Sequence, residues 1–375
     1  MKLPNFTASL LLTVLTIQIS SIHFSIKAGD FNFGLLSNKL AVEAAAQLES
    51  DKLQRLAYLE STPSSIVFVG DVLLARNVEH LMNRTSPSYP FQGISLRRAA
   101  SDSYVFGNFE SSIPEDHITT EVNKINFSVN KKFIPAAAKA GFTHFSLANN
   151  HSNDFGDDAF VNTTKVLSDS NIESFGHTRD FDINSVSFVS VKDAIVAVVG
   201  LHTLLNPPTQ EEIDSVLSYA EAFSDFQIVY IHWGVEYNPE SSTAQRGIAE
   251  QLVSSGADLI IGHHPHVVQE IGVIDGVPVF YSLGNYIFDQ YFSQSVQEGL
   301  LLRLEFGESI NIYLNPVTST DNLSQPAYMK KDQRGKFLRN LASVSSSDIL
   351  REIENGVLQL DTLVATSSKM AMINR

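Results

Sequence analysis

Short apolar runs along this chain alternate with segments of helical periodicity, and many of the apolar runs end in polar side chains. Runs that predict buried strands are at residues 66–71, 104–110, 143–151, 172–176, 227–234, 257–261, 277–285, 300–306 and 310–314. Residues 186–191 and 194–200 predict a hairpin. Helices are predicted at residues 135–141, 157–169, 211–223 and 244–255. Strands that alternate with helices and include a hairpin indicate an α/β fold with a mixed sheet.

The N-terminal segment differs from the rest of the chain. Residues 3–26 contain no Asp, Glu, Lys or Arg, and an uncharged run of this length can span a bilayer. We expect residues 1–28 to be a signal anchor or a signal peptide, and we favour the anchor because no small-x-small cleavage site follows the apolar run. A buried N-terminal helix is the remaining alternative. An anchor predicts an extracytoplasmic domain held at the cell membrane, whereas a cleaved segment predicts a secreted one.

The rest of the chain divides into three parts. Residues 29–62 are rich in Ala, Leu, Glu, Lys and Gln, which predicts a helical stalk or linker. Residues 63–316 carry the pattern of strands and helices and form the main domain. From about residue 317 the pattern weakens into Ser-rich and helical stretches, so we expect residues 317–375 to be a peripheral C-terminal tail.

Composition and charge narrow the classes of partner and site. The chain has 375 residues, of which 43% are hydrophobic and 18% charged, as expected for a folded globular protein. Its net charge of −15 argues against nucleic acid as a partner, because phosphate backbones are bound by clustered Lys and Arg. The chain contains no cysteine, so any metal ion must be held by nitrogen and oxygen ligands.

Five of the predicted strands end in side chains that commonly bind metal ions. These side chains are Asp71, Asn108 with Glu110, Asn150 with His151, His232, and His264 with His266. Carboxylates, imidazoles and an amide oxygen together suit a divalent metal, and α/β sheets place their sites at such strand ends. Taken singly, each motif has an ordinary alternative: residues 263–266 could form an exposed turn, and Asp71 could cap a helix.

Four further residues near these strand ends have weaker interpretations. Strand alternation predicts that His263 points away from His264. Trp233, Glu236 and Arg246 are candidate substrate-binding residues. Trp233 would line a pocket or pack in the core, and Glu236 would bond a ligand histidine or cap local structure. Arg246 would meet an anionic substrate or remain a solvated surface charge.

The motifs of this chain resemble those of a known family. They are at residues 69–71, 107–110, 149–156, 232–237, 262–266 and 282–290. In this order and composition they resemble the capsule-synthesis CapA family, which is associated with poly-γ-glutamate production and related to the calcineurin-like metallophosphoesterases. The resemblance covers roughly residues 64–305. It implies a calcineurin-like metallophosphoesterase fold for residues 63–316, with a central β-sandwich flanked by helices.

The resemblance also implies roles for the strand-end residues. In the wider superfamily two metals share a bridging carboxylate and activate a hydroxide, so we expect one or two divalent ions, with Mn, Fe or Zn favoured. The implied metal ligands are Asp71, Asn108, Glu110, Asn150, His232, His264 and His266. His151 would act as the general acid or stabilise developing negative charge. Asn285 and Asp289 would support the site structurally.

Two positions depart from the superfamily pattern. The Asp-x-His motif of the superfamily has Leu73 in place of its histidine, and the bridging Asp corresponds to Asn108. Glu110, two residues later, could substitute as the bridge. A mechanism with two metals is therefore not assumed for this chain, and a single ion is a consistent alternative.

The leading functional hypothesis is a membrane-anchored, extracytoplasmic protein with a divalent-metal centre that acts in the biosynthesis, export or processing of poly-γ-glutamate. The expected partners are this anionic polymer and membrane-embedded subunits of a polymer synthase, and the expected chemistry is metal-dependent hydrolysis. One alternative is a general metal-dependent phosphoesterase, which Leu73 and Asn108 disfavour. The other alternative is a non-catalytic accessory subunit that binds the polymer.

Overall fold

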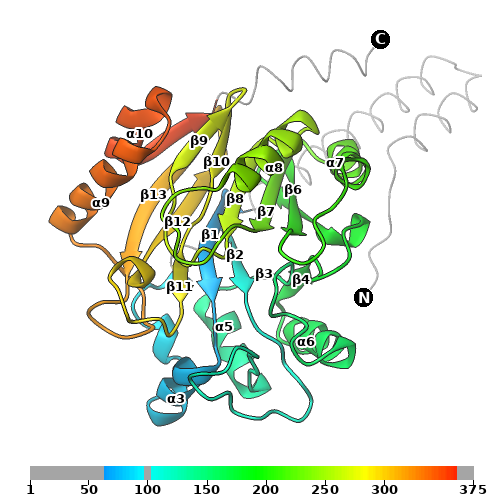
Figure 1. The fold of residues 1–375 in the computed structure, drawn as a ribbon, viewed down its shortest axis with the longest axis vertical. Helices are drawn as coiled ribbons and strands as arrows, with labels where there is room; N and C mark the ends of the chain where they lie inside the picture. The colour runs from blue at the N-terminus through cyan, green and yellow to red at the C-terminus, as the bar shows by residue number, and fades with distance from the viewer. Residues whose placement is uncertain (1–62, 97–102, 361–375) are drawn as a thin grey trace, which may run out of the picture. The chain divides into compact units, whose positions relative to one another are not determined.

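The computed structural model describes residues 63–96 and 103–360 (Figure 1). The expected anchor or signal peptide at residues 1–28 and the expected stalk at residues 29–62 lie outside these ranges. Within the described ranges, every helix is too short or too polar to span a bilayer.

The larger of two sheets contains nine strands of the described chain. They are β1 (Ser65–Val72), β2 (Ser103–Phe109), β3 (His144–Ser146), β4 (Glu173–Phe175), β11 (Asn285–Ile287), β12 (Glu298–Glu305), β13 (Ile310–Thr318), β14 (Ala327–Tyr328) and β15 (Val357–Leu360). Their order is β14-β13-β12-β1-β2-β3-β4, with β11 paired to β1 and β15 paired to β13. The pairs from β1 to β4 are parallel and the pairs of β12 with β1 and β13 are antiparallel, which confirms the predicted mixed sheet.

The smaller sheet contains six strands of the described chain. They are β5 (Val186–Val191), β6 (Ala194–His202), β7 (Phe226–His232), β8 (Leu259–His263), β9 (Ile271–Ile274) and β10 (Val277–Phe280), in the order β5-β6-β7-β8-β10-β9. β5 and β6 form the hairpin that the sequence predicts. β6, β7 and β8 are parallel, so their carboxyl ends meet at one edge of the sheet.

The two sheets share a hydrophobic core, and side-chain alternation along the strands builds it. Ile66 and Phe68 of β1 belong to the same buried cluster as Tyr230 of β7. The intervening Val67 belongs to a second cluster on the outer face of the larger sheet, and Val229 of β7 belongs to a third cluster on the outer face of the smaller sheet. Because successive strand residues point to opposite faces, these buried strands need apolar side chains at almost every position.

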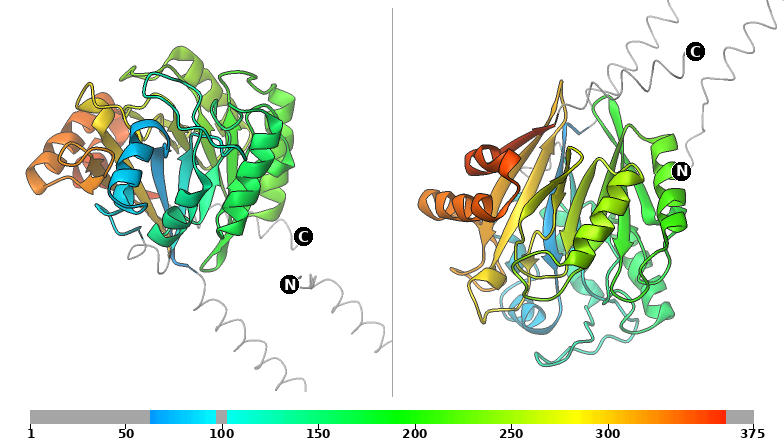
Figure 2. Two further views of the ribbon diagram at one scale, coloured as in Figure 1. Left: turned by 90° about the horizontal axis from the view of Figure 1, so that it is seen from below. Right: turned by 45° about the horizontal axis from the view of Figure 1, so that its top comes forward.

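Helices cover the outer faces of both sheets (Figure 2). Residues of α3 (Arg76–Arg84), α5 (Ile134–Ala140) and α6 (Asp157–Asp169) belong to the cluster on the larger sheet, and residues of α7 (Gln210–Phe223) and α8 (Thr243–Ser254) belong to the cluster on the smaller sheet. Short 3-10 helices are η1 (Tyr89–Phe91), η2 (Lys131–Phe133), η3 (Ile183–Ser185), η4 (Ser295–Gln297) and η5 (Ser347–Ile349). The fold is thus a central β-sandwich flanked by helices, as predicted.

The C-terminal boundary of the domain lies later than the sequence predicts. Residues 317–360 include the strands β14 and β15 and the helices α9 (Lys331–Val344) and α10 (Leu350–Asn355). Leu338 of α9 and Ile353 of α10 are completely buried in the core cluster shared by the two sheets. The end predicted at residue 316 is therefore wrong, because one apolar face of α9 and a strand of four residues give a weak sequence pattern. Residues 361–375 of the expected tail lie outside the described ranges.

Candidate metal centre

The carboxylates of the candidate site stand at the ends of two parallel strands. β1 and β2 pair so that Asp71 lies beside Asn108, and Glu110 directly follows β2. Asp71 and Glu110 are both 0% exposed. Residue 70 must be glycine here, because a Cβ atom would lie 1.9 Å from the backbone oxygen of Gly284. This close approach of the two backbones lets Asp71 pack against β11.

The histidines come from the matching edge of the smaller sheet. β7 ends at His232 and β8 ends at His263, and these two residues are in register. His264 and His266 follow β8 with φ angles of 94° and 58°. Residues other than glycine rarely adopt this left-handed conformation, and strained backbone of this kind concentrates at functional sites. The loop therefore holds its two imidazoles at a conformational cost.

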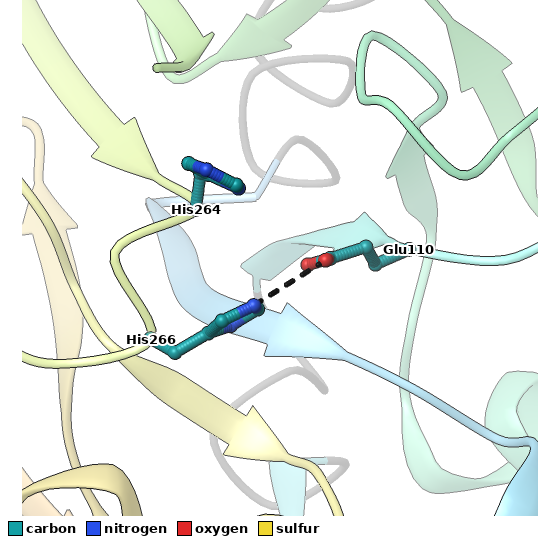
Figure 3. A group of neighbouring side chains, drawn as sticks. All are labelled: Glu110, His264 and His266. Atoms are coloured by element: carbon teal, nitrogen blue, oxygen red, sulfur yellow. Dashed lines mark ion pairs between the residues drawn. The ribbon is translucent and has the colours of Figure 1, made fainter. Parts of the chain in front are cut away.

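The two edges bring the carboxylates and imidazoles into contact. His266 Nδ1 lies 3.1 Å from Asp71 Oδ2, and His266 Nε2 lies 3.6 Å from Glu110 Oε1. The ring of His264 lies 4.8 Å from that of His232 between centroids. Figure 3 shows Glu110 on one segment facing His264 and His266 on the loop after β8. Residues far apart in the sequence thus form one buried cluster.

The residues present fit a divalent metal ion. Glu110 forms one set of potential ligands with His264 and His266 and another with Asp71 and His232, and the ligand atoms of each set lie within 4.8 Å of one another. Glu110 Oε1 and His264 Nδ1 are buried without a hydrogen-bond partner. Buried polar atoms are rarely left unpaired in native proteins, so a role as metal ligands would explain why these two atoms have no hydrogen-bond partner. Their nitrogen and oxygen chemistry suits a divalent ion.

Two of the imidazoles are in the form that binds a metal. Burial, with a further contribution from His264, lowers the pKa of His232 well below its ordinary value. Burial, with a further contribution from His266, lowers the pKa of His264 to about 3. Both rings are therefore neutral at neutral pH, and a neutral imidazole offers a nitrogen lone pair.

His266 and the carboxylates are coupled differently. Burial alone would lower the pKa of His266, but Glu110 and Asp71 raise it to about 9. Burial alone would raise the pKa of Asp71, but His263 and His266 hold it well below its ordinary value. Burial keeps the pKa of Glu110 well above its ordinary value despite the charge of His266. Without metal, His266 is therefore a protonated partner of buried carboxyl groups.

This electrostatic arrangement predicts that metal affinity rises with pH. A metal bound by His266 must displace the ring proton, which is held with a pKa of about 9. The apparent affinity is expected to rise by up to about tenfold per pH unit between pH 7 and 9 and to level off above that range. Calorimetric titration with Mn²⁺ or Zn²⁺ in buffers of different ionisation enthalpy measures both the affinity and the released proton. An affinity that is constant over this range, with no proton release, would contradict the assignment of His266.

Asn108 links the ligands by hydrogen bonds. Its Nδ2 donates to Asp71 Oδ1 at 2.8 Å and lies 3.1 Å from His232 Nδ1. Its Oδ1 accepts a hydrogen bond from Asn149 Nδ2 at 3.0 Å. With the amide oriented in this way, its oxygen is directed to Asn149, and the carboxylate between the two ligand sets is that of Glu110.

Asn150 and His151 approach from the loop after β3. Asn150 Oδ1 lies 2.8 Å from His232 Nε2, which places this amide oxygen beside a candidate ligand. His151 Nδ1 lies 3.0 Å from Asp154 Oδ2, and its Nε2 lies 4.0 Å from Glu110 Oε1. Asp154 therefore orients the imidazole and leaves Nε2 on the side of the cluster, as a proton donor requires.

The structure gives the three candidate substrate-binding residues different environments. Trp233 is 0% exposed, stacks on Tyr281 and donates from Nε1 to the Tyr281 carbonyl oxygen at 2.8 Å, so it packs in the core. Arg246 is exposed and donates to the hydroxyl and backbone oxygens of Ser241 on its own helix boundary, which is the solvated alternative. Glu236 is exposed, and its charge raises the pKa values of nearby Glu110 and His266. Of the three, Glu236 is the one that acts on the site electrostatically.

Two neighbours complete the inner side of the cluster. His263 packs its ring against Tyr230 at 4.1 Å between centroids and approaches Asp71 Oδ1 with Nδ1 at 3.4 Å. Asn285, expected as a structural support, lies 3.0 Å through Oδ1 from His266 Nδ1.

The sequence interpretation missed three residues near the site. His202 ends β6 in register with His232, and its buried Nε2 has no hydrogen-bond partner. Its position at the end of an apolar run was a signal that the sequence offered. Arg76 and Tyr237 also lie near the cluster. Arg76 had no comparable signal, because aromatic residues from distant segments position it.

The fold and the site together define the class of this protein. It is an α/β protein with two packed sheets flanked by helices, and its strand ends could hold a divalent metal ion. A family model described as "Bacterial capsule synthesis protein PGA_cap" matches residues 65–290, which include all the predicted ligands. The chain belongs to this family.

Curated relatives agree with this membership. The "Capsule biosynthesis protein CapA" of Bacillus anthracis is 30% identical over 263 residues, which cover 64% of this chain and 64% of the relative. The "PGA biosynthesis protein CapA" of Bacillus subtilis is 28% identical over 316 residues, which cover 79% of this chain and 82% of the relative. A "Probable polyglutamine synthesis accessory protein" of Mycobacterium tuberculosis is 24% identical over 207 residues, covering 48% and 54%. The chain spans less than two thirds of the length of the Bacillus anthracis relative.

Solved structures give a weaker likeness. A putative 5'-nucleotidase from Staphylococcus aureus aligns with a TM-score of 0.44 and 16% identity, covering 78% of this chain and 58% of that chain. A 5'-nucleotidase from Candida albicans aligns with a TM-score of 0.41 and 12% identity, covering 73% and 52%.

Proposed function

We propose that this protein acts in the synthesis, export or processing of poly-γ-glutamate through a divalent-metal centre. The observation that carries the proposal is the buried cluster of Glu110, His264 and His266 within the region matched by the family. The Bacillus subtilis relative is named for PGA biosynthesis, which supports the choice of polymer. The net charge of −15 also requires that an anionic polymer be bound at a local concentration of positive charge.

The proposed location is the outer side of the cell membrane. Residues 3–26 carry no charged side chain, and an anchor there would keep the domain beside membrane-embedded subunits of a polymer synthase. This arrangement suits a protein that handles a polymer as it leaves the cell.

The residues of the cluster have distinct proposed tasks. Asp71, Glu110, His232, His264 and His266 would hold the metal, with Asn150 beside them. When bound, a divalent ion in such a site polarises a carbonyl or phosphoryl oxygen. His151, oriented by Asp154, would donate a proton from Nε2 to the leaving group.

Two ligand sets share Glu110, but Leu73 disfavours two equal metal positions. Leu73 occupies the place where the superfamily has a ligand histidine, and it is 0% exposed within the hydrophobic core. It offers no donor atom to an ion. This loss, together with the orientation of Asn108, also disfavours a general phosphoesterase of the two-metal type.

A second function is a non-catalytic accessory role in which the metal centre binds carboxylates of the polymer. The description of the Mycobacterium tuberculosis relative as an accessory protein favours this alternative. It predicts bound metal and bound polymer without turnover.

The variant His151→Ala distinguishes the two functions. If His151 is the general acid, its loss is expected to lower turnover by about 10²- to 10⁴-fold, because that is the usual contribution of a positioned proton donor. The bound metal is expected to be unchanged, since His151 is outside both ligand sets. The measurement is hydrolysis of poly-γ-glutamate and of a phosphoester by the full-length protein, with metal content by mass spectrometry.

The control for this variant is His80→Ala, which removes an exposed histidine of α3. It is expected to leave both metal content and turnover unchanged. Stoichiometric metal with no turnover on either substrate by the unmodified protein would decide for the accessory role. Absence of stoichiometric metal would contradict both functions.

A further inference from the structure

Arg76 is a cationic residue beside the metal centre with an unusual environment. It lies five residues after Asp71 at the start of α3, with a φ angle of 52°. Its side chain is only 12% exposed, and its Nε is buried without a hydrogen-bond partner. A charged group so nearly buried, with a donor left unpaired, indicates a function beyond surface solvation.

Two aromatic rings link the guanidinium of Arg76 to the site. Its Cζ lies 4.6 Å from the centre of the Phe127 ring and 5.6 Å from that of Phe288. Phe127 in turn packs on His151 at 4.1 Å between ring centroids, and Phe288 packs on His266 at 4.6 Å. Each ring therefore contacts Arg76 and one functional histidine. Through these two rings, the packing of the guanidinium is coupled to the proposed proton donor and to a proposed metal ligand.

Asp289 holds the guanidinium from the other side. It forms an ion pair with Arg76 Nη2 and accepts a hydrogen bond from the backbone N–H of Asn77 at 3.1 Å. The charge of Arg76 still reaches the site, since it counteracts the rise in the pKa values of Glu110 and Tyr237. Asp289 therefore positions Arg76 without removing its positive charge from the cluster.

Tyr237 lies on the same side of the cluster. Its φ angle is 63°, and its backbone N–H donates to the Pro265 carbonyl oxygen at 2.8 Å, within the histidine loop. Its ring lies 6.0 Å from that of His266, and its hydroxyl oxygen accepts a hydrogen bond from Gln290 Nε2 at 2.9 Å. Burial, together with the charge of Glu236 and a side-chain hydrogen bond to it, raises the pKa of Tyr237 to about 12, so the hydroxyl stays protonated at neutral pH. To donate to a bound anion, the hydroxyl would exchange Glu236 for that anion. The residue is 42% exposed, so a ligand can reach it from solvent.

We propose that Arg76 and Tyr237 bind an anionic group of the substrate beside the metal centre, and that Asp289 and Gln290 position them. The identity of the anion as a side-chain carboxylate of a γ-linked glutamate chain rests on the proposed function; phosphate shares the same recognition chemistry. Adjacent residues 289 and 290 thus hold both binding groups, which explains why this late segment approaches the site. Arg76 and Tyr237 are substrate-binding residues in this assignment, and neither supplies a metal ligand.

The test is calorimetric titration of the metal-loaded, full-length protein with a γ-linked glutamate oligomer and, separately, with inorganic phosphate. Arg76→Gln is expected to weaken binding of the oligomer by about tenfold or more, because it removes a charge-assisted contact. Tyr237→Phe is expected to weaken it by a few fold, because it removes a neutral hydrogen bond. The metal content of both variants is expected to equal that of the unmodified protein.

Two controls separate binding from structural support. Arg84→Gln removes the exposed arginine at the end of the same helix and is expected to leave binding unchanged. Asp289→Asn removes the ion pair that positions Arg76 but keeps the charge of Arg76, so it is expected to weaken oligomer binding less than Arg76→Gln does. If Arg76 served only to support the fold through this ion pair, Asp289→Asn and Arg76→Gln would lower the thermal midpoint to the same extent and the affinity to the same extent. That result would overturn the proposal.

The two anions make failure of this proposal distinguishable from failure of the proposed function. Binding of phosphate but not of the oligomer, lost in Arg76→Gln, would retain the anion site and reject the polymer. Binding of the oligomer with equal affinity by Arg76→Gln and the unmodified protein would retain the polymer and reject the site. Binding of neither anion by the folded, metal-loaded protein would reject the site as well.

Discussion

His264→Ala is expected to weaken metal binding by about 100-fold or more, since even loss of groups that support a metal ligand costs about 10- to 100-fold in affinity. His264 is the neutral imidazole of one ligand set, and burial lowers its pKa to about 3. Its Nδ1 has no hydrogen-bond partner in the described structure, so the loss removes a donor that the fold has left free. The measurement is metal content after dialysis, followed by calorimetric titration.

The same variant is also expected to reduce the stabilisation that bound metal gives to the folded protein. A metal present at 100 times its dissociation constant stabilises the folded state by about 2.7 kcal/mol. The thermal midpoint of the unmodified protein is therefore expected to rise on addition of metal. At the same concentration, a 100-fold weaker affinity leaves about 0.4 kcal/mol of this stabilisation, so the midpoint of His264→Ala is expected to rise much less. His80→Ala, which removes an exposed histidine, should behave as the unmodified protein. An equal rise in the midpoint of His264→Ala would exclude His264 as a ligand.

The second large effect is expected from Gly70→Ala, which adds a single methyl group beside Asp71. The new Cβ would lie 1.9 Å from the backbone oxygen of Gly284, and a backbone atom cannot rotate away as a side chain can. The same oxygen accepts a hydrogen bond from the Asp71 N–H at 3.1 Å. Relief of the clash must separate β1 from β11, so we expect a loss of about 3 kcal/mol or more in the free energy of unfolding.

Gly247→Ala is the matched control for Gly70→Ala, and its effect on stability is expected to be the opposite. A Cβ added to Gly247, inside α8, meets no atom within 4 Å, so Gly247→Ala is expected to stabilise the protein by up to about 1 kcal/mol. Chemical denaturation measures both changes. Because Asp71 follows Gly70, Gly70→Ala is also expected to reduce metal binding. Similar stabilities for the two variants would show that β1 and β11 are not packed as closely as described.

The strand-end histidines show how well the sequence predicts the site. His232 and His264 follow apolar runs that the sequence identifies as buried strands, and parallel strands bring their carboxyl ends to one edge. The same rule would have included His202, which ends β6. This rule could not decide whether Trp233 lines a pocket or packs in the core, because its neighbours in space include Tyr281, 48 positions later in the chain.

Arg76 shows where prediction from sequence ends. No local pattern marks it, because the rings that hold it belong to Phe127 and Phe288, in two distant segments. The orientation of the Asn108 amide similarly depends on Asp71, His232 and Asn149, which come from three other elements. The C-terminal boundary was missed for the same reason, since the apolar face of α9 becomes meaningful only when the two sheets provide a surface for it.

The sequence by itself determined the α/β class, the nitrogen and oxygen character of the site and the strand ends that carry Asp71, Glu110, His232, His264 and His266. It could do so because apolar periodicity and the residue at a strand end are local properties. Only the tertiary structure decided which of these groups touch, that Trp233 packs in the core and that Arg76 packs between Phe127 and Phe288. Those outcomes depend on side chains far apart in the chain, whose contacts, burial and charge coupling exist only after the two sheets have packed together.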